Sequence, residues 1–385
     1  MAWTEKRSGG WLGRYRVDGI VKSTPVFKRK TDAKQAADRL EQEAKRGTYI
    51  DPKRGRMTVG DWADRWLASL EITPKTDHTY RELLGSLILP TWGSVPLSRI
   101  QLVEVKRWVA SMRGPRGELS DARRRSAGAQ LVRMLDAAVD EGIISANPAR
   151  SRSGKVSYLP SAKRSKEHRY LTHAELEALA RSCGEFAALV RLAGLTGLRW
   201  GEVTALRVSD VDLMRRRVTV RQAYSIIGGR KVLGEPKTHE RRVLTVPPFL
   251  ADSLTAQVAG KEQEDLVFST ASGEALDNTN FARRVLQPAQ KAAGVERLTF
   301  HDLRHTAASL AVASGANVKA VQRMLGHASA AMTLDVYAGL FDTDAEELAE
   351  RLSRAHRDAV AEDVAHYVPT SSVAALRAAS SGQAS

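Results

Sequence analysis

The chain has 385 residues, of which 43% are hydrophobic, so it is long enough to form two or three domains with real cores rather than a disordered polymer. Lys and Arg number 59 against 44 Asp and Glu, and the resulting net charge of +15 favours a polyanionic partner, nucleic acid first among them. The single cysteine excludes an internal disulfide framework, and the chain lacks both a membrane-spanning apolar run and a signal-peptide core, so we expect a protein of the reducing cytoplasm without a membrane partner.

Two short strands are predicted near the N-terminus, over 11–17 and 24–30, with a turn at Asp18-Gly19 between them. A helix should follow over 31–46, because Thr31 is a favourable N-cap residue. Together with a further strand, these elements predict a small α+β module of three strands and one helix.

This module, which we assign to residues 1–54, lies in the most basic part of the chain. Residues 1–60 contain 15 Lys and Arg against 7 Asp and Glu. Basic and aromatic side chains on a strand face could read DNA, and a solvated charged sheet is the alternative. The candidate side chains are Trp11, Arg14, Tyr15, Arg16, Lys28, Arg29 and Lys30.

Residues 55–149 are predicted to be entirely helical. Apolar residues recur at helical spacing over 59–70, 76–89, 98–112 and 120–141. Trp62 and Trp66 fit a helical core better than a base-stacking surface. The basic run at the start of the last helix supplies candidate phosphate contacts, namely Arg123, Arg124 and Arg125.

A basic linker is expected over 150–169, where seven basic residues and one acidic residue occur with little periodicity. Such an extended strap would suit a protein that closes around a duplex, and Lys163 and Arg164 are candidate DNA contacts. A plain flexible linker is the alternative.

Residues 170–368 are predicted to be a mainly helical domain with a small sheet. Its first helix should start at the capping box formed by Thr172 and Glu175. Strands are expected over about 216–224 and 231–247, with a turn at Gly228-Gly229, and helices from about 277 to 366. The residues after 368 have the composition of a disordered tail.

The stretch HDLRH, 301–305, gathers His301, Arg304 and His305 on one side of a predicted helix. Thr299 and Asp302 form a capping box there, and the unpaired N–H groups of a helix start favour a bound anion. An ordinary helix start with exposed polar residues is one alternative. Half of a zinc site is another, but the single cysteine and the absence of an acidic residue at HExxH spacing argue against a metal.

Four short motifs in the second half of the chain are informative as a set. They are TGLRWGE (196–202), EPKTHERR (235–242), HDLRH (301–305) and LGHASAAMTLDVY (325–337). In this order they resemble the tyrosine recombinases, the phage-integrase family of site-specific DNA recombinases. The layout is similar to that of the heterobivalent phage integrases. The resemblance implies an arm-type DNA-binding module at 1–54, a helical, SAM-like core-binding domain at 55–149, the linker at 150–169, a catalytic domain at 170–368 and a disordered tail at 369–385.

The resemblance implies an enzyme that cuts and rejoins DNA through a 3′-phosphotyrosine and a Holliday junction, and so integrates or excises a mobile element. No cofactor and no metal are implied. The expected partners are double-stranded DNA, at core-type and arm-type sites, and three further copies of the chain in a tetramer. A host DNA-bending protein and an excision factor are implied by the same analogy, at the nucleoid of a bacterial cell.

Carried onto this sequence, the family pattern makes Tyr337 the nucleophile. Arg199 and Arg304 would hold the non-bridging oxygens of the scissile phosphate, since planar guanidinium groups bind such oxygens in pairs. Lys237 would protonate the departing 5′-oxygen, and Lys231 is its rival for that role.

The two histidine positions of the pattern fall on His301 and His327. His301 is expected to hydrogen-bond Tyr337 and accept its proton, while His327 should bond the phosphate. Glu202 and His305 are expected to be supporting residues that brace the arginines and the helix start.

Two other classes of protein share parts of this pattern. A type IB-like topoisomerase would use the same chemistry without pairing two sites, and the basic N-terminal module argues against it. A non-catalytic DNA-binding regulator would not need Tyr337. A helix near 343–365, with Leu348, Leu352, Val360 and Val364 along it, is a candidate for docking onto a neighbouring copy, with packing within its own chain as the alternative.

Overall fold

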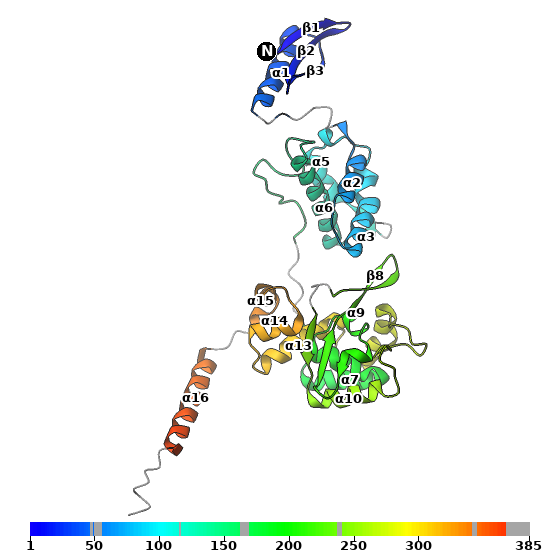
Figure 1. Ribbon diagram of the computed structural model, residues 1–385, viewed down its shortest axis with the longest axis vertical. Coiled ribbons are helices and arrows are strands. Elements are labelled where there is room, and N and C mark those ends of the chain that lie inside the picture. The colour runs from blue at the N-terminus through cyan, green and yellow to red at the C-terminus, as the bar shows by residue number, and fades with distance from the viewer. Residues whose placement is uncertain are drawn as a thin grey trace, which may run out of the picture. The chain divides into compact units, whose positions relative to one another are not determined.

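The computed structural model describes residues 1–46, 49, 56–114, 117–161, 169–236, 241–340 and 345–366. The chain separates into two compact units: Met1–Ser165 with Ile226–Arg230, and Lys166–Ser225 with Lys231–Ser385. Helices predominate in the described residues, and the sheets are small (Figure 1). The tail predicted at 369–385 lies outside the described residues.

The N-terminal module contains the predicted three strands and one helix. Its strands pair antiparallel in the order β1-β2-β3, and the helix packs on one face of the sheet (Figure 1). The buried side chains between sheet and helix include Tyr15, Ala37 and Leu40. The elements are β1 (Trp3–Arg7), β2 (Gly10–Val17), β3 (Ile20–Phe27) and α1 (Lys30–Lys45).

Several boundaries in this module differ from the prediction, and the strand predicted to run to residue 30 ends at Phe27, because α1 begins at Lys30. Asp18 and Gly19 both adopt left-handed φ values, 46° and 79°, so the two-residue turn returns the chain at once and the third strand starts at Ile20 rather than at 24. Arg29, not Thr31, occupies the N-cap position of the helix, and its side chain makes no capping hydrogen bond. The Thr31 hydroxyl instead donates to Asp32 Oδ1 at 3.3 Å.

The region 56–149 is mainly helical, as predicted, but not entirely, because Arg113–Gly114 and Gly117–Glu118 form a short antiparallel pair of strands. Its helices enclose a core that includes Trp62 and Trp66, and the Trp62 indole donates to the Met134 carbonyl at 2.8 Å, which confirms that these two residues are internal. The predicted 76–89 helix begins earlier, at Pro74, and runs into a π turn. The elements are α2 (Val59–Ala68), α3 (Pro74–Leu83), η2 (Leu84–Ile88), α4 (Leu89–Trp92), η3 (Leu97–Arg99), α5 (Leu102–Ser111), β4 (Arg113–Gly114), β5 (Gly117–Glu118) and α6 (Asp121–Asp140).

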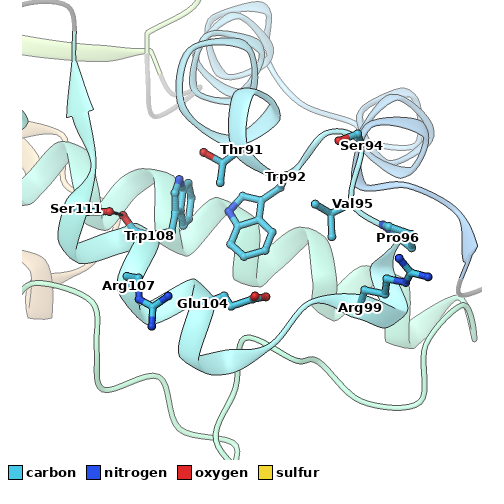
Figure 2. Close-up of a pocket in the computed structure, with 10 residues that line it drawn as sticks. All are labelled: Thr91, Trp92, Ser94, Val95, Pro96, Arg99, Glu104, Arg107, Trp108 and Ser111. Atoms are coloured by element: carbon cyan, nitrogen blue, oxygen red, sulfur yellow. Dashed lines mark hydrogen bonds between the residues drawn. The ribbon is translucent and has the colours of Figure 1, made fainter.

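A hollow of about 700 Å³ lies on the surface of this helical region, between the segment 91–99 and α5 (Figure 2). Trp92 and Trp108 meet edge to face on one side of it, with ring centroids 5.9 Å apart, while Arg99 and Glu104 carry charge to its rim. No residue of the four sequence motifs lines this hollow.

The second unit combines helices with one three-stranded antiparallel sheet of order β10-β7-β6. A separate hairpin of β8 and β9 branches from it, and the turn of this hairpin, Ile226–Arg230, groups with the first unit. The elements of the second unit up to the sheet are α7 (His173–Ser182), η4 (Gly184–Phe186), α8 (Ala187–Thr196), α9 (Trp200–Val203), η5 (Val208–Asp210), β6 (Val211–Asp212), β7 (Arg217–Val220), β8 (Ala223–Ile227), β9 (Arg230–Gly234) and β10 (Arg242–Thr245). The later elements are α10 (Pro248–Val258), α11 (Asn278–Phe281), η6 (Ala282–Leu286), α12 (Gln287–Ala292), α13 (Phe300–Ala313), α14 (Val318–Leu325), α15 (Ala330–Tyr337), η7 (Ala338–Leu340) and α16 (Ala345–His366).

The strand prediction for this unit was partly wrong. Each of the predicted strands, 216–224 and 231–247, is divided between two sheets, because β7 pairs with β10 and β6 whereas β8 pairs with β9. The predicted turn at Gly228-Gly229 is present, with φ values of 56° and 78°. A hydrophobic core below the sheet packs α13 against α8, and this contact brings the motif at 196–202 close to the motif at 301–305.

Candidate active site

The first motif forms a short turn between α8 and α9. Gly197 ends α8 in the left-handed region, at φ 70°, where a side chain would be strained and would meet Leu325 at 2.4 Å. Arg199 then caps α9. Its backbone N–H donates to Glu202 Oε2 and its Nη1 to Glu202 Oε1, both at 2.8 Å. These contacts leave the Arg199 side chain 24% exposed, available to a ligand.

Glu202 is almost completely buried, with a side chain only 2% exposed. Arg242, the first residue of β10, donates to both its carboxylate oxygens, at 3.0 and 2.7 Å. Burial by itself raises the pKa of Glu202, but the hydrogen bonds and charges of Arg242 and Arg199 outweigh it and lower the pKa to about 2. Glu202 therefore stays ionised and orients Arg199.

Arg242 was not among the residues predicted from the sequence, although it is the last residue of the quoted motif EPKTHERR. A usable signal was present. Leu244 of β10 and Val246 just after the strand are apolar and alternate with Arg242, so Arg242 is expected on the core side of β10. An arginine there requires an acidic partner.

Arg304 is buried in α13, with 3% of the residue exposed. Its two terminal nitrogens donate to the Gly197 carbonyl at 2.6 Å and the Leu325 carbonyl at 2.7 Å. Burial, and next the charge of Arg199, lower its pKa to about 9, so it remains protonated at neutral pH. One guanidinium thus joins the end of α8 to the end of α14.

The start of α13 has the predicted capping box. The Asp302 carboxylate accepts from the Thr299 backbone N–H at 2.6 Å and from its hydroxyl at 2.8 Å. His301, in the first turn, is exposed. It lines a hollow of about 270 Å³ together with Arg199, and the other lining residues are Leu198, Trp200, Asn278, Thr299 and Phe300.

His327 follows Gly326, which ends α14 in the left-handed region at φ 65°. Its Nδ1 hydrogen-bonds the hydroxyl of Thr333 in α15 at 2.9 Å. Burial, and next the charge of Arg304, lower the pKa of His327 to about 4, so this imidazole is neutral at pH 7.

Tyr337 ends α15 with only 2% of the residue exposed. Its hydroxyl hydrogen-bonds His305 Nδ1 at 2.8 Å, and its ring lies nearly parallel to that of His327, with centroids 6.4 Å apart. Burial raises the pKa of the Tyr337 phenol to about 12. The hydroxyl is therefore protonated and enclosed.

The hydrogen bond to Tyr337 corrects one expectation. His305 was expected to brace the arginines and the helix start, and His301 to bond Tyr337, but the structure gives this bond to His305. The physical reason is its place on α13: one turn after the exposed His301, His305 is buried on the side that faces α15.

The structure gives little evidence about which lysine could protonate the leaving oxygen. Lys237 lies outside the described residues. Lys231, its rival, donates through Nζ to the Ala275 carbonyl. Lys163 and Arg164 of the linker also lie outside the described residues.

The other candidate DNA contacts are distributed over two regions. Arg123 pairs with Glu82, Arg124 with Asp121 at 2.5 Å, and Arg125 donates to the Pro160 carbonyl at 2.7 Å. These internal contacts hold all three side chains near the surface of the helical region.

In the N-terminal module, Tyr15 is only 1% exposed and packs under the sheet, so it is not part of a DNA-reading face. Arg14 pairs with Glu5 at 3.0 Å, and Lys30 lies 5.1 Å from the ring of Trp11. The remaining candidates are exposed: Arg16, Lys28 and Arg29.

Within the described residues, no three His, Cys, Asp or Glu side chains are grouped so as to hold a metal ion. None of the helices described is both long enough and apolar enough to cross a membrane.

Comparisons with known proteins agree with this arrangement. The model of the phage integrase family matches residues 169–343. A putative prophage phiRv2 integrase of Mycobacterium tuberculosis is 29% identical over 344 residues, covering 85% of this chain and 88% of the relative. Tyrosine recombinase XerC of a Shewanella species is 30% identical over 221 residues, or 56% of this chain and 67% of the relative.

Among solved structures, the Tn1549 transposon integrase in complex with transposon right end DNA has the same fold, with a TM-score of 0.65 and 20% identity over 78% of this chain and all of that one. The match to these tyrosine recombinases identifies the chain as a DNA strand-exchange enzyme. The chain belongs to the phage integrase family of tyrosine recombinases.

Proposed function

We propose that this recombinase is a phage-type integrase in which Tyr337 attacks a DNA phosphodiester at a specific site. One observation carries the proposal: Arg199, Arg304, His327 and Tyr337 come from separate elements, yet hydrogen bonds connect these elements. Arg304 of α13 bonds the ends of α8 and α14, and α15 is bonded through Thr333 to His327 and through Tyr337 to His305. A structural role for any one of them would not require the others.

In the proposed reaction the Tyr337 oxygen bonds to phosphorus and the 5′-oxygen leaves with a proton. Arg199 and Arg304 stabilise the charge that develops on the non-bridging oxygens, and the neutral His327 can donate a further hydrogen bond. Lys237 is the proposed proton donor, with Lys231 as the alternative. The phosphotyrosine conserves the energy of the broken bond for rejoining.

The proton of Tyr337 must be removed during attack. His301 remains the proposed acceptor, and the contact with His305 makes that residue a second candidate. Because the hydroxyl is enclosed and bonded to His305, α15 must move before it can reach a phosphate. In the conformation described, the Tyr337 hydroxyl is therefore not accessible to a DNA phosphate.

We propose four protomers on two DNA sites, which pass strands through a Holliday junction. A solved lambda integrase is a tetramer bound to a Holliday junction, and its fold matches with a TM-score of 0.53 at 21% identity. Leu352 and Val360 of α16 are exposed, which supports docking onto a neighbouring copy rather than packing within the chain. A host DNA-bending protein and an excision factor complete the proposal, at the nucleoid in the bacterial cytoplasm.

The N-terminal module is the proposed reader of arm-type sites. On β2, Arg14 and Arg16 lie on the face opposite the buried Tyr15, so the basic side chains occupy the face that the helix leaves uncovered. The helical region and the linker would grip the core-type site through phosphate contacts.

The test is a suicide-substrate assay without magnesium. The protein and its Tyr337→Phe variant are incubated with nicked attachment-site DNA, denatured and sized. We expect a covalent protein–DNA band with the native chain alone, while both proteins bind the DNA equally. The Phe variant keeps the ring and loses only the hydroxyl.

Each other outcome is informative. A band that persists in Tyr337→Phe would move the nucleophile elsewhere. Binding without any band in a complete two-site mixture would favour a DNA-binding regulator. Relaxation of supercoiled DNA that needs no paired sites would favour a topoisomerase.

A further inference from the structure

The buried arginine at the start of β10 has no role in the family pattern carried onto this chain, and it contacts two separate parts of the candidate site. We propose that Arg242 is a positioning residue for strand cleavage: it holds the Glu202 carboxylate that orients Arg199, and it braces the Gly326 turn that presents His327. This inference rests on the proposed cleavage by Tyr337.

The first contact is with Glu202. Each carboxylate oxygen accepts two donors: Oε1 from Arg199 Nη1 at 2.8 Å and Arg242 Nη1 at 3.0 Å, and Oε2 from the Arg199 backbone N–H at 2.8 Å and Arg242 Nη2 at 2.7 Å. Arg242 therefore supplies half of the donors to a carboxylate that has almost no access to water. A planar guanidinium suits this paired geometry, which a single ammonium cannot reproduce.

The second contact is with the turn after α14. A Cβ atom built on Gly326 would lie 3.1 Å from Arg242 Cδ and 3.2 Å from its Nε and Nη1. The guanidinium thus lies against the backbone of Gly326, immediately before His327. Arg242 is the one side chain that touches both Glu202 and this turn among the contacts described for the two.

These contacts occupy most of the Arg242 side chain. It is 10% exposed, and both terminal nitrogens are bonded to Glu202. Its Nε is buried and has no acceptor among the described residues, a state that costs free energy. Because its terminal nitrogens are bonded to Glu202 and its Nε is enclosed, Arg242 acts through Arg199 and His327 rather than on the phosphate itself.

The charges around Glu202 support the same role for Arg242. Glu202 faces Arg199 and Arg242 directly and Arg304 at longer range, and burial opposes all three. Without Arg242, burial is balanced by two cations instead of three, so the pKa of Glu202 rises. Protonated Glu202 would hold Arg199 less firmly, and cleavage would then depend on pH.

The test compares Arg242→Gln and Arg242→Lys with the native full-length chain. Arg215→Gln is the matched control, because Arg215 also pairs with a carboxylate, Asp212, but on the surface of the same unit. For each protein we would measure the thermal midpoint, DNA binding, and the single-turnover rate of covalent adduct formation on nicked attachment-site DNA from about pH 7 to about pH 5.

We expect Arg242→Gln to bind DNA within about twofold of the native chain and to cleave it at least tenfold more slowly, with a rate that falls further toward pH 5. Arg242→Lys keeps the positive charge but not the paired N–H donors of the guanidinium, and should recover part of the rate.

Adding Glu202→Gln to Arg242→Gln should cause little further loss of rate, because both residues act through one contact. It should also remove the fall in rate toward pH 5. Arg215→Gln should match the native chain.

A native rate and pH profile in Arg242→Gln would overturn the inference. If that variant does not fold, the Lys variant decides the question, and a native rate and profile there would overturn the inference equally. The absence of any adduct from the native chain would refute the proposed cleavage. This outcome is distinguishable from a failure of the inference, in which the native chain does form the adduct.

Discussion

Single side chains in this site owe their protonation state to burial and to neighbouring cations. His327 is the clearest case, because its pKa, near 4, lies below the 6.5 of an exposed imidazole. Between these values the unfolded chain binds a proton that the folded chain does not. The free energy of unfolding should therefore fall as the pH decreases from about 6.5 to about 4.

This pH dependence can be assigned to His327 by substitution. His327→Gln keeps a side chain that can hydrogen-bond Thr333 but has no group that titrates in this range, so its stability should fall less steeply with decreasing pH. Urea unfolding at several pH values measures the slope. The same slope in both proteins would show that His327 is not the group responsible.

Motif residues were predictable one by one, whereas their contacts were not. Arg199, Arg304 and Tyr337 were found from local sequence and a family resemblance. Whether His301 or His305 meets Tyr337 depends on which turn of α13 lies opposite the end of α15, and the periodicity of the sequence does not distinguish residues one turn apart on the same face. The contact of Arg242 was not predicted either, because its partner Glu202 is 40 residues away.

Turns between elements set the geometry of the site as strongly as the side chains do. Gly326 combines a left-handed φ of 65° with close contact to Arg242, whereas Gly294 has a φ of 67° and open space around its Cα. Substitution by alanine should cost about 1–2 kcal/mol of backbone strain at either position. Only at Gly326 would the added methyl group also displace the guanidinium.

We therefore expect Gly294→Ala and Gly326→Ala to lower the thermal midpoint by similar amounts but to differ in catalysis. Gly326→Ala should slow adduct formation several-fold more than Gly294→Ala does. Thermal unfolding and single-turnover cleavage on the same preparations would test this. Equal cleavage rates would mean that the turn tolerates a shift of Arg242.

Elements governed by local interactions were predicted well. The capping boxes at Thr172 and Thr299 are present, because Glu175 and Asp302 lie only three residues away from them. Strand pairing was predicted less well. The split of 216–224 between two sheets depends on β10, a strand more than 20 residues later in the chain, and no periodicity within 216–224 reports on it.

At the scale of the whole molecule, the N-terminal module should be separable in function. Its strands and α1 enclose a small core of their own, around Tyr15 and Leu40. Deleting residues 1–54 should therefore leave binding to a core-type site nearly unchanged while strongly reducing recombination between complete sites.

Gel-shift titration on core-site DNA and a two-plasmid recombination assay would test this separation. Point variants offer a milder check: Arg16→Ala should weaken binding to arm-type DNA only, since this side chain is exposed on β2 of the N-terminal module. Full recombination by the truncated chain would mean that the module does not read arm-type sites.

The sequence by itself determined the overall charge, the mainly helical composition, the order of the four motifs and the local capping signals, because each depends on composition or on residues a few positions apart. Only the tertiary structure decided that His305 holds Tyr337, that Arg304 joins the ends of α8 and α14, and that Arg242 supports both Glu202 and the Gly326 turn. These contacts join residues 21 to 107 positions apart, and they arise from how the elements pack, which no local pattern encodes.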